Sequence, residues 1–286
     1  MKTLQEKAGV LIEALPYLRR FAGKTVVIKY GGAAMTEQAL KKSVAEDLVL
    51  LKTVGLNPVV VHGGGPEITA AMKKQGKLAT FKGGLRVTDL ETMEITEGVL
   101  VGRINQQIVG YMNSHGAVAA GLSGKDGHLL VAKKLKGAHD LGFVGTVEKV
   151  NVGILEALQG QGFIPIIAPV GLGRDGHAYN CNADQVAGAV AGALKAEKLV
   201  MMTDQPGLLK DVKDPRSLIS SLRVKDLPRL KKAGVIDKGM LPKLDACAAA
   251  LKAGVGKVHI IDGRVPHALL LEIFTDSGVG TEITQP

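Results

Sequence analysis

Apolar strand-like runs that end at glycine turns, each followed by a helical pattern, recur along most of this chain. The clearest are TVVIKY at 25–30 and NPVVVH at 57–62, which lead into a pair and a triplet of glycines. Continuous β-branched runs that alternate with helices are typical of parallel strands covered on both faces. The pattern predicts an α/β fold: an open three-layer α/β/α sandwich with a mainly parallel sheet. Shorter runs at 129–135 and 142–150 flank a glycine-bearing loop and predict a local antiparallel insertion.

The regular order of these elements favours one domain over residues 1–286. No shift of composition marks a linker, and we expect two functional halves, 23–175 and 176–286. Residues 1–22 carry apolar side chains at three- and four-residue spacing, which predicts an amphipathic helix. This helix either packs on its own core or forms an oligomerisation arm exchanged with a partner subunit.

Composition and charge exclude several classes of partner. The net charge of +9 invites a nucleic-acid partner, but the lysines are dispersed and aromatic residues make up only 3%. We therefore expect no nucleic acid, and a solvated surface that favours small anionic substrates. Cys181 and Cys247 are too few for a disulfide framework or a zinc site, so we expect no metal site and a cytoplasmic protein. No run approaches the ~18 apolar residues of a membrane helix, so we expect no membrane association.

Two glycine turns follow adjacent predicted strands: KYGG at 29–32 and HGGG at 62–65. Ligands of parallel sheets bind at the carboxyl ends of the strands, where turns and helix N-termini offer unpaired N–H groups. Glycine lets an anion approach the backbone closely, so both turns predict phosphate or oxyanion binding. Lys29 would set its ammonium against the same anion; the alternative is a lysine that extends from the sheet edge into solvent.

Polar residues elsewhere suggest partners for these turns. In YNCNADQ, Asn182 is a natural N-cap, which leaves Asn180 and Asp184 free to bind a ligand. Arg86, in the glycine-flanked GLRVTD, either holds a carboxylate with two hydrogen bonds or is an ordinary surface arginine. Lys243 lies at a helix start, where the helix dipole disfavours a cation, which hints at a functional role.

Two other motifs point to different nucleotide folds. AGKTV at 22–26 resembles the end of a Walker A loop but lacks the first glycine and enters a strand, so we reject it. GLGRDG at 171–176 satisfies G-x-G-x-x-G behind a strand, with Asp204 ending a later strand. A dinucleotide fold is therefore the runner-up, although HAYNCN separates these glycines from the next helix.

Taken together, the chain resembles the acetylglutamate kinases of the amino-acid kinase family. The stretches that carry the resemblance, in chain order, are VIKYGGAAM, VHGGGPEI, GLRVTD, NCNADQVAG, TDQPGLL, GMLPK and IDGRVPHALLLEIFTDSGVGTEI. The resemblance implies transfer of the ATP γ-phosphate to the side-chain carboxylate of N-acetyl-L-glutamate in arginine biosynthesis. Mg²⁺ would be held mainly by the ATP phosphates.

The resemblance also implies residue roles. Lys29 and Lys243 would stabilise the phosphoryl group in flight, and Asp184 would orient both lysines. The acyl amino acid would be held by Gly64, Gly65, Arg86 and Asn180. The phosphates and nucleotide would be held by Gly31, Gly32, Thr203, Asp204, Gly207 and Leu208, together with the segment before Met240.

The N-terminal helix and the EIFTDSGVGT tail resemble the arginine-sensitive branch of the family. That branch implies inhibition by L-arginine and a hexamer built as a trimer of dimers, with a nitrogen-signalling protein as a further possible partner. The arginine effector site would comprise Tyr17, His259, Glu272 and Gly278.

Some features leave alternatives open. Lys238 replaces a glycine that usually precedes the GMLPK motif, and Gln205 and Pro206 stand where an aliphatic residue often occurs. Aspartate, glutamate and UMP kinases share the lysine and glycine turns, so the substrate prediction rests on GLRVTD and YNCNADQ. A non-catalytic nucleotide or amino-acid sensor is the alternative from another class, and the two lysines with Asp184 disfavour it.

Overall fold

The computed structural model describes residues 4–211, 213–232, 236, 239–275 and 278–285. Lys238 and most of the segment before Met240 lie outside these ranges. The contribution predicted for that segment to the nucleotide site therefore falls outside the described residues.

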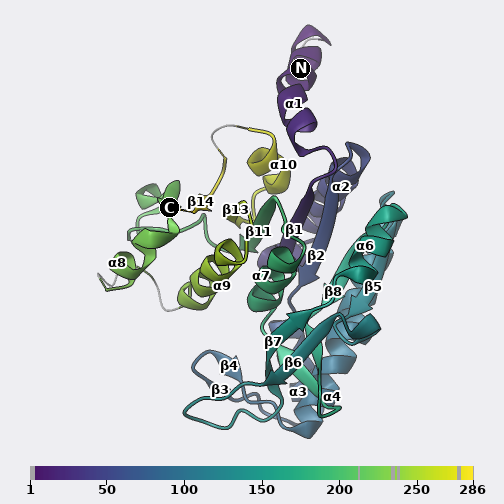
Figure 1. Ribbon diagram of the computed structural model, residues 1–286, viewed down its shortest axis with the longest axis vertical. Helices are drawn as coiled ribbons and strands as arrows, with labels where there is room; N and C mark the ends of the chain where they lie inside the picture. Colours follow the sequence, from purple (N-terminus) through teal and green to yellow (C-terminus); the bar gives the residue numbers. More distant parts are fainter. Residues whose placement is uncertain (1–3, 212, 233–235, 237–238, 276–277, 286) are drawn as a thin grey trace.

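The main sheet of the described chain has eight strands. Their spatial order is β12 (Ser221–Arg223), β14 (Thr281–Thr284), β13 (Lys257–Asp262), β11 (Lys198–Thr203), β1 (Thr25–Tyr30), β2 (Asn57–His62), β8 (Ile164–Ala168) and β5 (Ala119–Ser123). Every neighbouring pair is parallel except β13 and β14. The predicted mainly parallel sheet is confirmed, and β1 and β2, the strands that end at the two glycine turns, are neighbours in its interior (Figure 1).

Helices cover both faces of this sheet. The described helices that follow β1 are α2 (Gln38–Thr53), α3 (Gly65–Lys74), α4 (Leu90–Glu97), α5 (Gln106–Ser114), α6 (Gly153–Gly160), α7 (Ala183–Ala193), α8 (Leu227–Lys232), α9 (Leu241–Lys252) and α10 (Ala268–Ile273). Short 3₁₀ turns are η1 (Gly32–Met35), η3 (Asp126–His128), η4 (Pro215–Ser217) and η5 (Val224–Asp226), and η2 (Gly98–Asn105) is a π-helical stretch between α4 and α5.

Two apolar clusters of described residues fill the spaces between the three layers. Val26 and Ile28 of β1 belong to one cluster, whereas Val27 between them belongs to the other. Successive strand side chains point to opposite faces, so both faces of β1 are buried. The first cluster takes in residues of α2, α4 and α5, and the second takes in residues of α7 and α9. This arrangement is the predicted three-layer sandwich.

The predicted antiparallel insertion is confirmed but is larger than expected. β6 (Leu130–Lys134) and β7 (Val144–Val150) pair antiparallel and close into a small barrel with β9 (Val170–Gly173) and β10 (Ala178–Cys181). This barrel lies below the main sheet in Figure 1, near the β3–β4 hairpin (Phe81–Lys82, Leu85–Arg86). The GLGRDG motif is therefore a hairpin between β9 and β10, turned at Gly176 with φ +81°. No helix opens within those glycines, so the dinucleotide interpretation is wrong.

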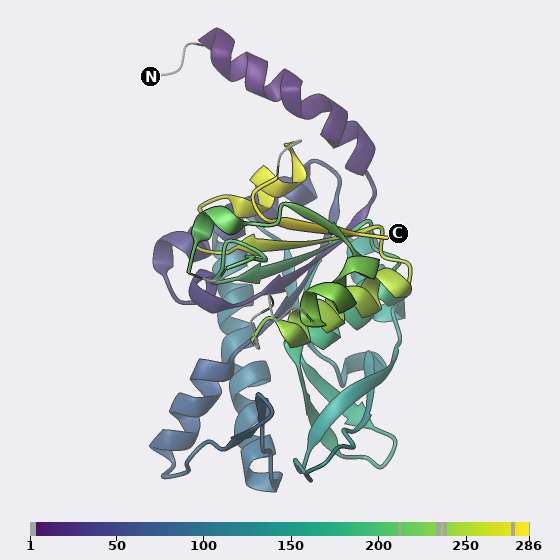
Figure 2. The ribbon, with the colours of Figure 1, turned by 90° about the vertical axis from the view of Figure 1, so that its left-hand side faces the viewer.

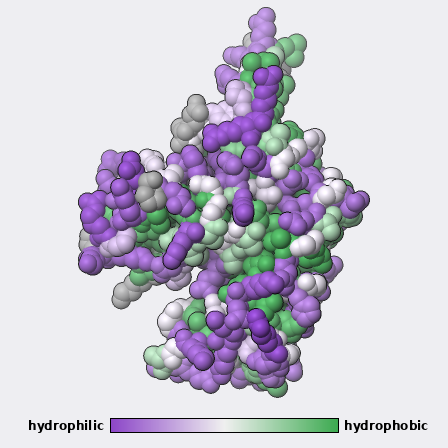
Figure 3. Space-filling model, in the orientation of Figure 1, coloured by the Kyte–Doolittle hydropathy of each residue, from purple (hydrophilic) through white to green (hydrophobic). Residues whose placement is uncertain are grey.

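The N-terminal helix α1 (Leu4–Phe21) extends away from the body of the molecule (Figure 2). Its apolar side chains Leu4, Leu11 and Ile12 are 84%, 71% and 68% exposed, whereas Phe21 at its end is buried. Figure 3 shows hydrophobic residues beside hydrophilic ones on this projection. One of the two predicted alternatives was a helix packed on its own core. The exposed apolar side chains show that most of α1 is not packed in that way. Among the described helices, none is both long and apolar enough to cross a bilayer.

Candidate active site

Three charged side chains predicted to act together lie in direct contact at the carboxyl edge of the sheet. Lys29 is the penultimate residue of β1, Asp184 lies in the first turn of α7, and Lys243 lies in the first turn of α9. The Lys29 Nζ is 3.2 Å from Asp184 Oδ1, and the Lys243 Nζ donates to Asp184 Oδ2 at 2.7 Å. The fold thus joins three residues from distant parts of the sequence into one ion-pair cluster.

Burial sets the electrostatics of this cluster. The Lys29, Asp184 and Lys243 side chains are only 11%, 9% and 21% exposed. Burial lowers the pKa of Lys29, an effect that Asp184 opposes and Lys243 reinforces. Burial alone would raise the pKa of Asp184, but Lys29 and Lys243 hold it below its usual value. Two ammonium groups and one carboxylate leave a net positive charge in a poorly solvated place, which suits a developing anion.

The KYGG turn is tightly packed around this cluster. A Cβ on Gly31 would lie 2.7 Å from the Lys29 Nζ, and one on Gly32 would lie 2.2 Å from Asp204 Oδ1. Gly32 also has φ +68°, a conformation that other residues rarely adopt. The Asp204 carboxylate accepts a hydrogen bond from the Ala33 N–H at 2.7 Å. The structure therefore places Asp204, a predicted nucleotide residue, directly on the first glycine turn.

The predicted acyl-amino-acid residues converge as well. One pocket of about 200 Å³, which we call the acyl-amino-acid pocket, is lined by Gly64, Gly65, Arg86 and Asn180. The pocket continues to Asn182, which caps α7 by accepting hydrogen bonds from the N–H groups of Asp184 and Gln185, as predicted. It therefore adjoins the lysine–aspartate cluster. The HGGG turn is joined to the KYGG turn directly, since the Gly63 N–H donates to the Tyr30 carbonyl at 2.9 Å.

Arg86 is not an ordinary surface arginine. It is 7% exposed, and its Nη2 donates to the Gly65 carbonyl and to Thr69 Oγ1, both at 2.9 Å. Its guanidinium also lies 4.8 Å from the centre of the Phe81 ring. Burial lowers the pKa of Arg86. The residue is thus held against α3 with its charge at the pocket wall.

The other predicted nucleotide residues follow β11 but differ in their surroundings. Thr203 ends the strand and is buried, while Gly207 has φ +147° beside Thr281. Leu208 is 2% exposed and its N–H donates to Thr281 Oγ1 at 2.8 Å. The Leu208 side chain therefore supports this loop from the core.

The four predicted effector residues also lie together, around a pocket of about 340 Å³ that we call the C-terminal pocket. His259 Nδ1 lies 2.5 Å from Glu272 Oε1, and a Cβ on Gly278 would lie 2.9 Å from Glu272 Oε2. Burial would raise the pKa of Glu272, but the contact with His259 holds it below its usual value. Tyr17 enters the pocket from α1.

The C-terminal pocket is also lined by four charged residues that were not predicted from the sequence: Arg20, Lys198, Lys257 and Glu282. A signal was present, because β11 and β13 both begin with lysine. Parallel pairing sets Lys198 opposite Lys257 and brings both amines to one end of the sheet.

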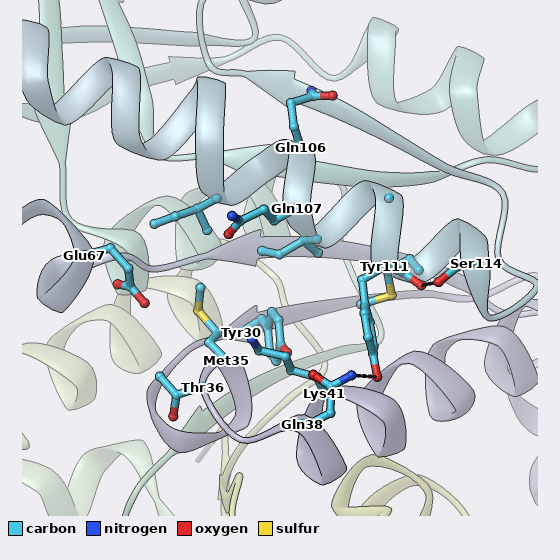
Figure 4. Close-up of a pocket in the computed structure, with 14 residues that line it drawn as sticks. Tyr30, Met35, Thr36, Gln38, Lys41, Glu67, Gln106, Gln107, Tyr111 and Ser114 are labelled. Carbon is cyan, nitrogen blue, oxygen red and sulfur yellow. Dashed lines mark hydrogen bonds between the residues drawn. The ribbon is translucent and has the colours of Figure 1, made fainter. Parts of the chain in front are cut away.

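A larger pocket of about 730 Å³ opens between α2 and α5 (Figure 4). Gln38 Nε2 donates to Tyr111 Oη across it at 3.3 Å. Neither of the two lysines predicted to be catalytic lines this pocket. In the described ranges, no group of three or more His, Cys, Asp or Glu side chains is arranged to hold a metal ion.

Comparisons with known proteins identify the family of this chain. The amino acid kinase family profile matches residues 24–262. Acetylglutamate kinases of Moorella thermoacetica and Geobacter metallireducens are each 56% identical to this chain, over 97% of both chains in the first case and 99% in the second.

Solved structures show the same fold. N-acetylglutamate synthase from Neisseria gonorrhoeae, complexed with coenzyme A and N-acetyl-glutamate, has a TM-score of 0.86 at 25% identity over the whole of this chain, which spans 64% of the synthase. A Giardia lamblia carbamate kinase bound to AMP-PNP has a TM-score of 0.66 at 19% identity over 93% of this chain and 99% of its own. The chain therefore belongs to the amino acid kinase family, within its acetylglutamate kinase branch.

Proposed function

We propose that this kinase transfers the γ-phosphate of ATP to the side-chain carboxylate of N-acetyl-L-glutamate, as a step of arginine biosynthesis. The observation that carries the proposal is the buried cluster in which Asp184 bridges Lys29 and Lys243, at 3.2 and 2.7 Å. The pocket that contains Arg86 and Asn180 adjoins it. The name of the full-length relatives supports the choice of acceptor.

The chemistry needs no general base. A glutamate side chain has a reference pKa near ~4.3, so the acceptor is already an anion at neutral pH. Phosphoryl transfer spreads negative charge over the equatorial oxygens, and catalysis consists mainly of positioning and charge stabilisation. In our proposal the two ammonium groups and the amides of Gly31 and Gly32 stabilise that charge, while Asp184 holds the ammonium groups in place.

Magnesium fits this arrangement as an ion that accompanies ATP. The Asp184 carboxylate is already engaged by both lysines, so the ATP phosphates would be the main ligands. When bound, the ion would neutralise charge on the phosphates. We further propose that residues 23–175 bind the acyl amino acid and 176–286 bind the nucleotide, the latter through the loop that begins at Thr203 and Asp204.

The test is an ADP-release assay with four acceptors: N-acetyl-L-glutamate, glutamate, aspartate and UMP. We expect turnover with the first, at a kcat/KM far above the others, and formation of a hydroxylamine-reactive acyl phosphate. ADP release that is independent of any of these acceptors, or highest with UMP, contradicts the proposal.

We also propose that L-arginine inhibits the kinase by binding in the C-terminal pocket. The carboxylates of Glu272 and Glu282 suit a guanidinium group, and Lys198 and Lys257 suit the arginine carboxylate. Repeating the assay with arginine tests inhibition. If Glu272→Gln leaves the inhibition constant unchanged, arginine does not bind there.

The exposed apolar side chains of α1 support its role as an arm that joins dimers into a hexamer. Deleting residues 1–22 should leave a dimer with weakened arginine inhibition. A hexamer of the truncated chain in light scattering contradicts the arm assignment. A cytoplasmic location and docking of a nitrogen-signalling protein on the hexamer are further proposals, the latter testable by pull-down with such a protein.

A further inference from the structure

His62, the last residue of β2, is an imidazole with no part in the proposed chemistry. It is 0% exposed and does not line the acyl-amino-acid pocket, although the three glycines after it do. Its Nδ1 lies 2.8 Å from the Gly63 carbonyl oxygen, and its Nε2 lies 3.3 Å from the Asn105 Nδ2. A wholly buried polar ring placed directly before a substrate turn requires a physical explanation.

The two contacts of the ring require the same tautomer. The Gly63 carbonyl can only accept, so the proton must be on Nδ1. The Asn105 Nδ2 also donates to the Ile166 carbonyl at 2.8 Å and approaches the Leu122 carbonyl at 3.4 Å, which fixes the orientation of that amide. The Nε2 of His62 must then be the acceptor. Burial lowers the pKa of His62 to about 4, so the ring is neutral near pH 7.

Asn105 reaches His62 because the helix before it is widened. It is the last residue of the π-helical stretch Gly98–Asn105 and is 1% exposed. Two apolar residues of the same stretch pack closely against the HGGG turn. A Cβ on Gly64 would lie 2.5 Å from Ile104 Cδ1 and 2.7 Å from Leu100 Cδ2. π-Helical stretches inside α-helices are frequent at functional sites. This one supplies both an apolar and a polar contact to the turn.

These contacts determine where the substrate-binding amides point. The Gly63 N–H is engaged by the Tyr30 carbonyl and the Gly63 carbonyl is engaged by His62. Because a trans peptide is planar, the Gly64 N–H must point away from the Gly63 carbonyl, and therefore away from the buried ring. Among the described residues, the N–H groups of Gly64 and Gly65 donate to no protein acceptor. They remain free for a ligand in the pocket that these glycines line.

We propose that His62 and Asn105 are positioning residues that lock the HGGG turn with the amides of Gly64 and Gly65 directed at the acceptor substrate. Neither side chain touches substrate; each acts through the Gly63–Gly64 peptide. The proposal rests on the proposed function, in which Gly64 and Gly65 bind the acyl amino acid.

Paired substitutions at His62 test the role of each ring nitrogen. Asparagine places an amide near the Nδ1 position, where it can still donate to Gly63, whereas glutamine places its amide near the Nε2 position. His62→Gln should lower kcat/KM for N-acetylglutamate about tenfold or more, with the KM for ATP within about twofold of wild type. His62→Asn should lose less than His62→Gln. A reversed order, or full activity in both variants, overturns the proposal.

Val61→Ala is the matched control, because Val61 precedes His62 in β2 and is equally buried. It should lower the melting temperature without a selective loss of kcat/KM for the acceptor. If the His62 and Val61 variants lose activity in the same proportion to their melting temperatures, His62 is merely structural.

Nitrogen-15 NMR of histidine-labelled wild-type protein reads the tautomer directly and needs no variant to fold. We expect the Nδ1–H form for His62 and no titration above about pH 5; an Nε2–H form refutes the argument. This spectrum is independent of the substrate. Absence of turnover with N-acetylglutamate in wild type would therefore contradict the proposed function. The tautomer of His62 would still test whether its ring holds the HGGG turn as we propose.

Discussion

Replacing Lys29 by alanine removes one of two cations from a poorly solvated site and should lower kcat strongly. A unit charge about 4 Å from a phosphoryl charge contributes about 4 kcal/mol at an effective dielectric constant of about 20. Each ~1.4 kcal/mol corresponds to a factor of ten in rate. Since Lys243 remains and can shift towards the phosphoryl group, we expect a loss of about 10²-fold rather than the full ~10³-fold.

The loss should appear in kcat much more than in KM. The charge on the transferring group develops in the transition state, so the lost interaction is weaker in the ground state. The fold should persist, because Asp184 keeps its 2.7 Å contact with Lys243. Lys24→Ala is the matched control: Lys24 is exposed and lies just before the opposite end of the same strand. It should retain wild-type kcat.

The assay is steady-state ADP release with each substrate varied in turn, with melting temperatures measured on the same preparations. If Lys29→Ala retains kcat within about threefold of wild type, the ammonium does not act on the travelling phosphoryl group. A loss confined to the KM for ATP would instead indicate that Lys29 only binds nucleotide.

Three further substitutions probe other parts of the structure. Gly64→Ala sets a Cβ 2.5 Å from Ile104 Cδ1, so it should lower stability by about 1–3 kcal/mol and raise the KM for N-acetylglutamate; an unchanged melting curve contradicts this. Asp47 lies buried in α2 and contacts His267; burial raises its pKa from 3.8 to about 6, so wild type should lose stability as pH rises through that range. Asp47→Asn should avoid that loss and gain about 2–3 kcal/mol on wild type between pH 4 and pH 7 in urea unfolding, whereas parallel pH curves would refute it. Asp184→Asn removes the carboxylate that opposes the lowering of the Lys29 pKa by burial. In the pH profile of kcat, the alkaline decline of the variant should therefore begin at a lower pH than in wild type; an unshifted decline argues against the ion pair.

The central part of the fold could be predicted because its signals are local. Val26 to Ile28 form an unbroken apolar run, and the glycines after Tyr30 and His62 mark where β1 and β2 end. In a parallel sheet those ends share one edge, which is why two turns 33 positions apart in sequence were expected to meet.

Other parts depend on contacts that no local pattern records. β5 was not recognised, because Ala119–Ser123 is short and contains alanine and glycine where an apolar run would be expected. The β9–β10 hairpin matched a glycine motif of a different fold. Asn105 lies within a helical pattern, and only the widening of the helix turns its amide into the sheet. The barrel and the positioning contacts therefore required the structure.

The two glycines after β1 show why a residue type alone does not explain a site. Gly31 has φ −174°, extended backbone that any residue adopts, so its lack of a side chain is required for space: the Lys29 ammonium folds back over it. Gly32 has φ +68° and faces the Asp204 carboxylate, so it is required both for conformation and for space. Lys29 stands one residue before the end of β1, and the lack of a side chain at Gly31 leaves room for its ammonium to reach Asp184. A side chain at residue 31 would therefore displace the charge to which we assign a role in phosphoryl transfer, while leaving the backbone of the turn unstrained.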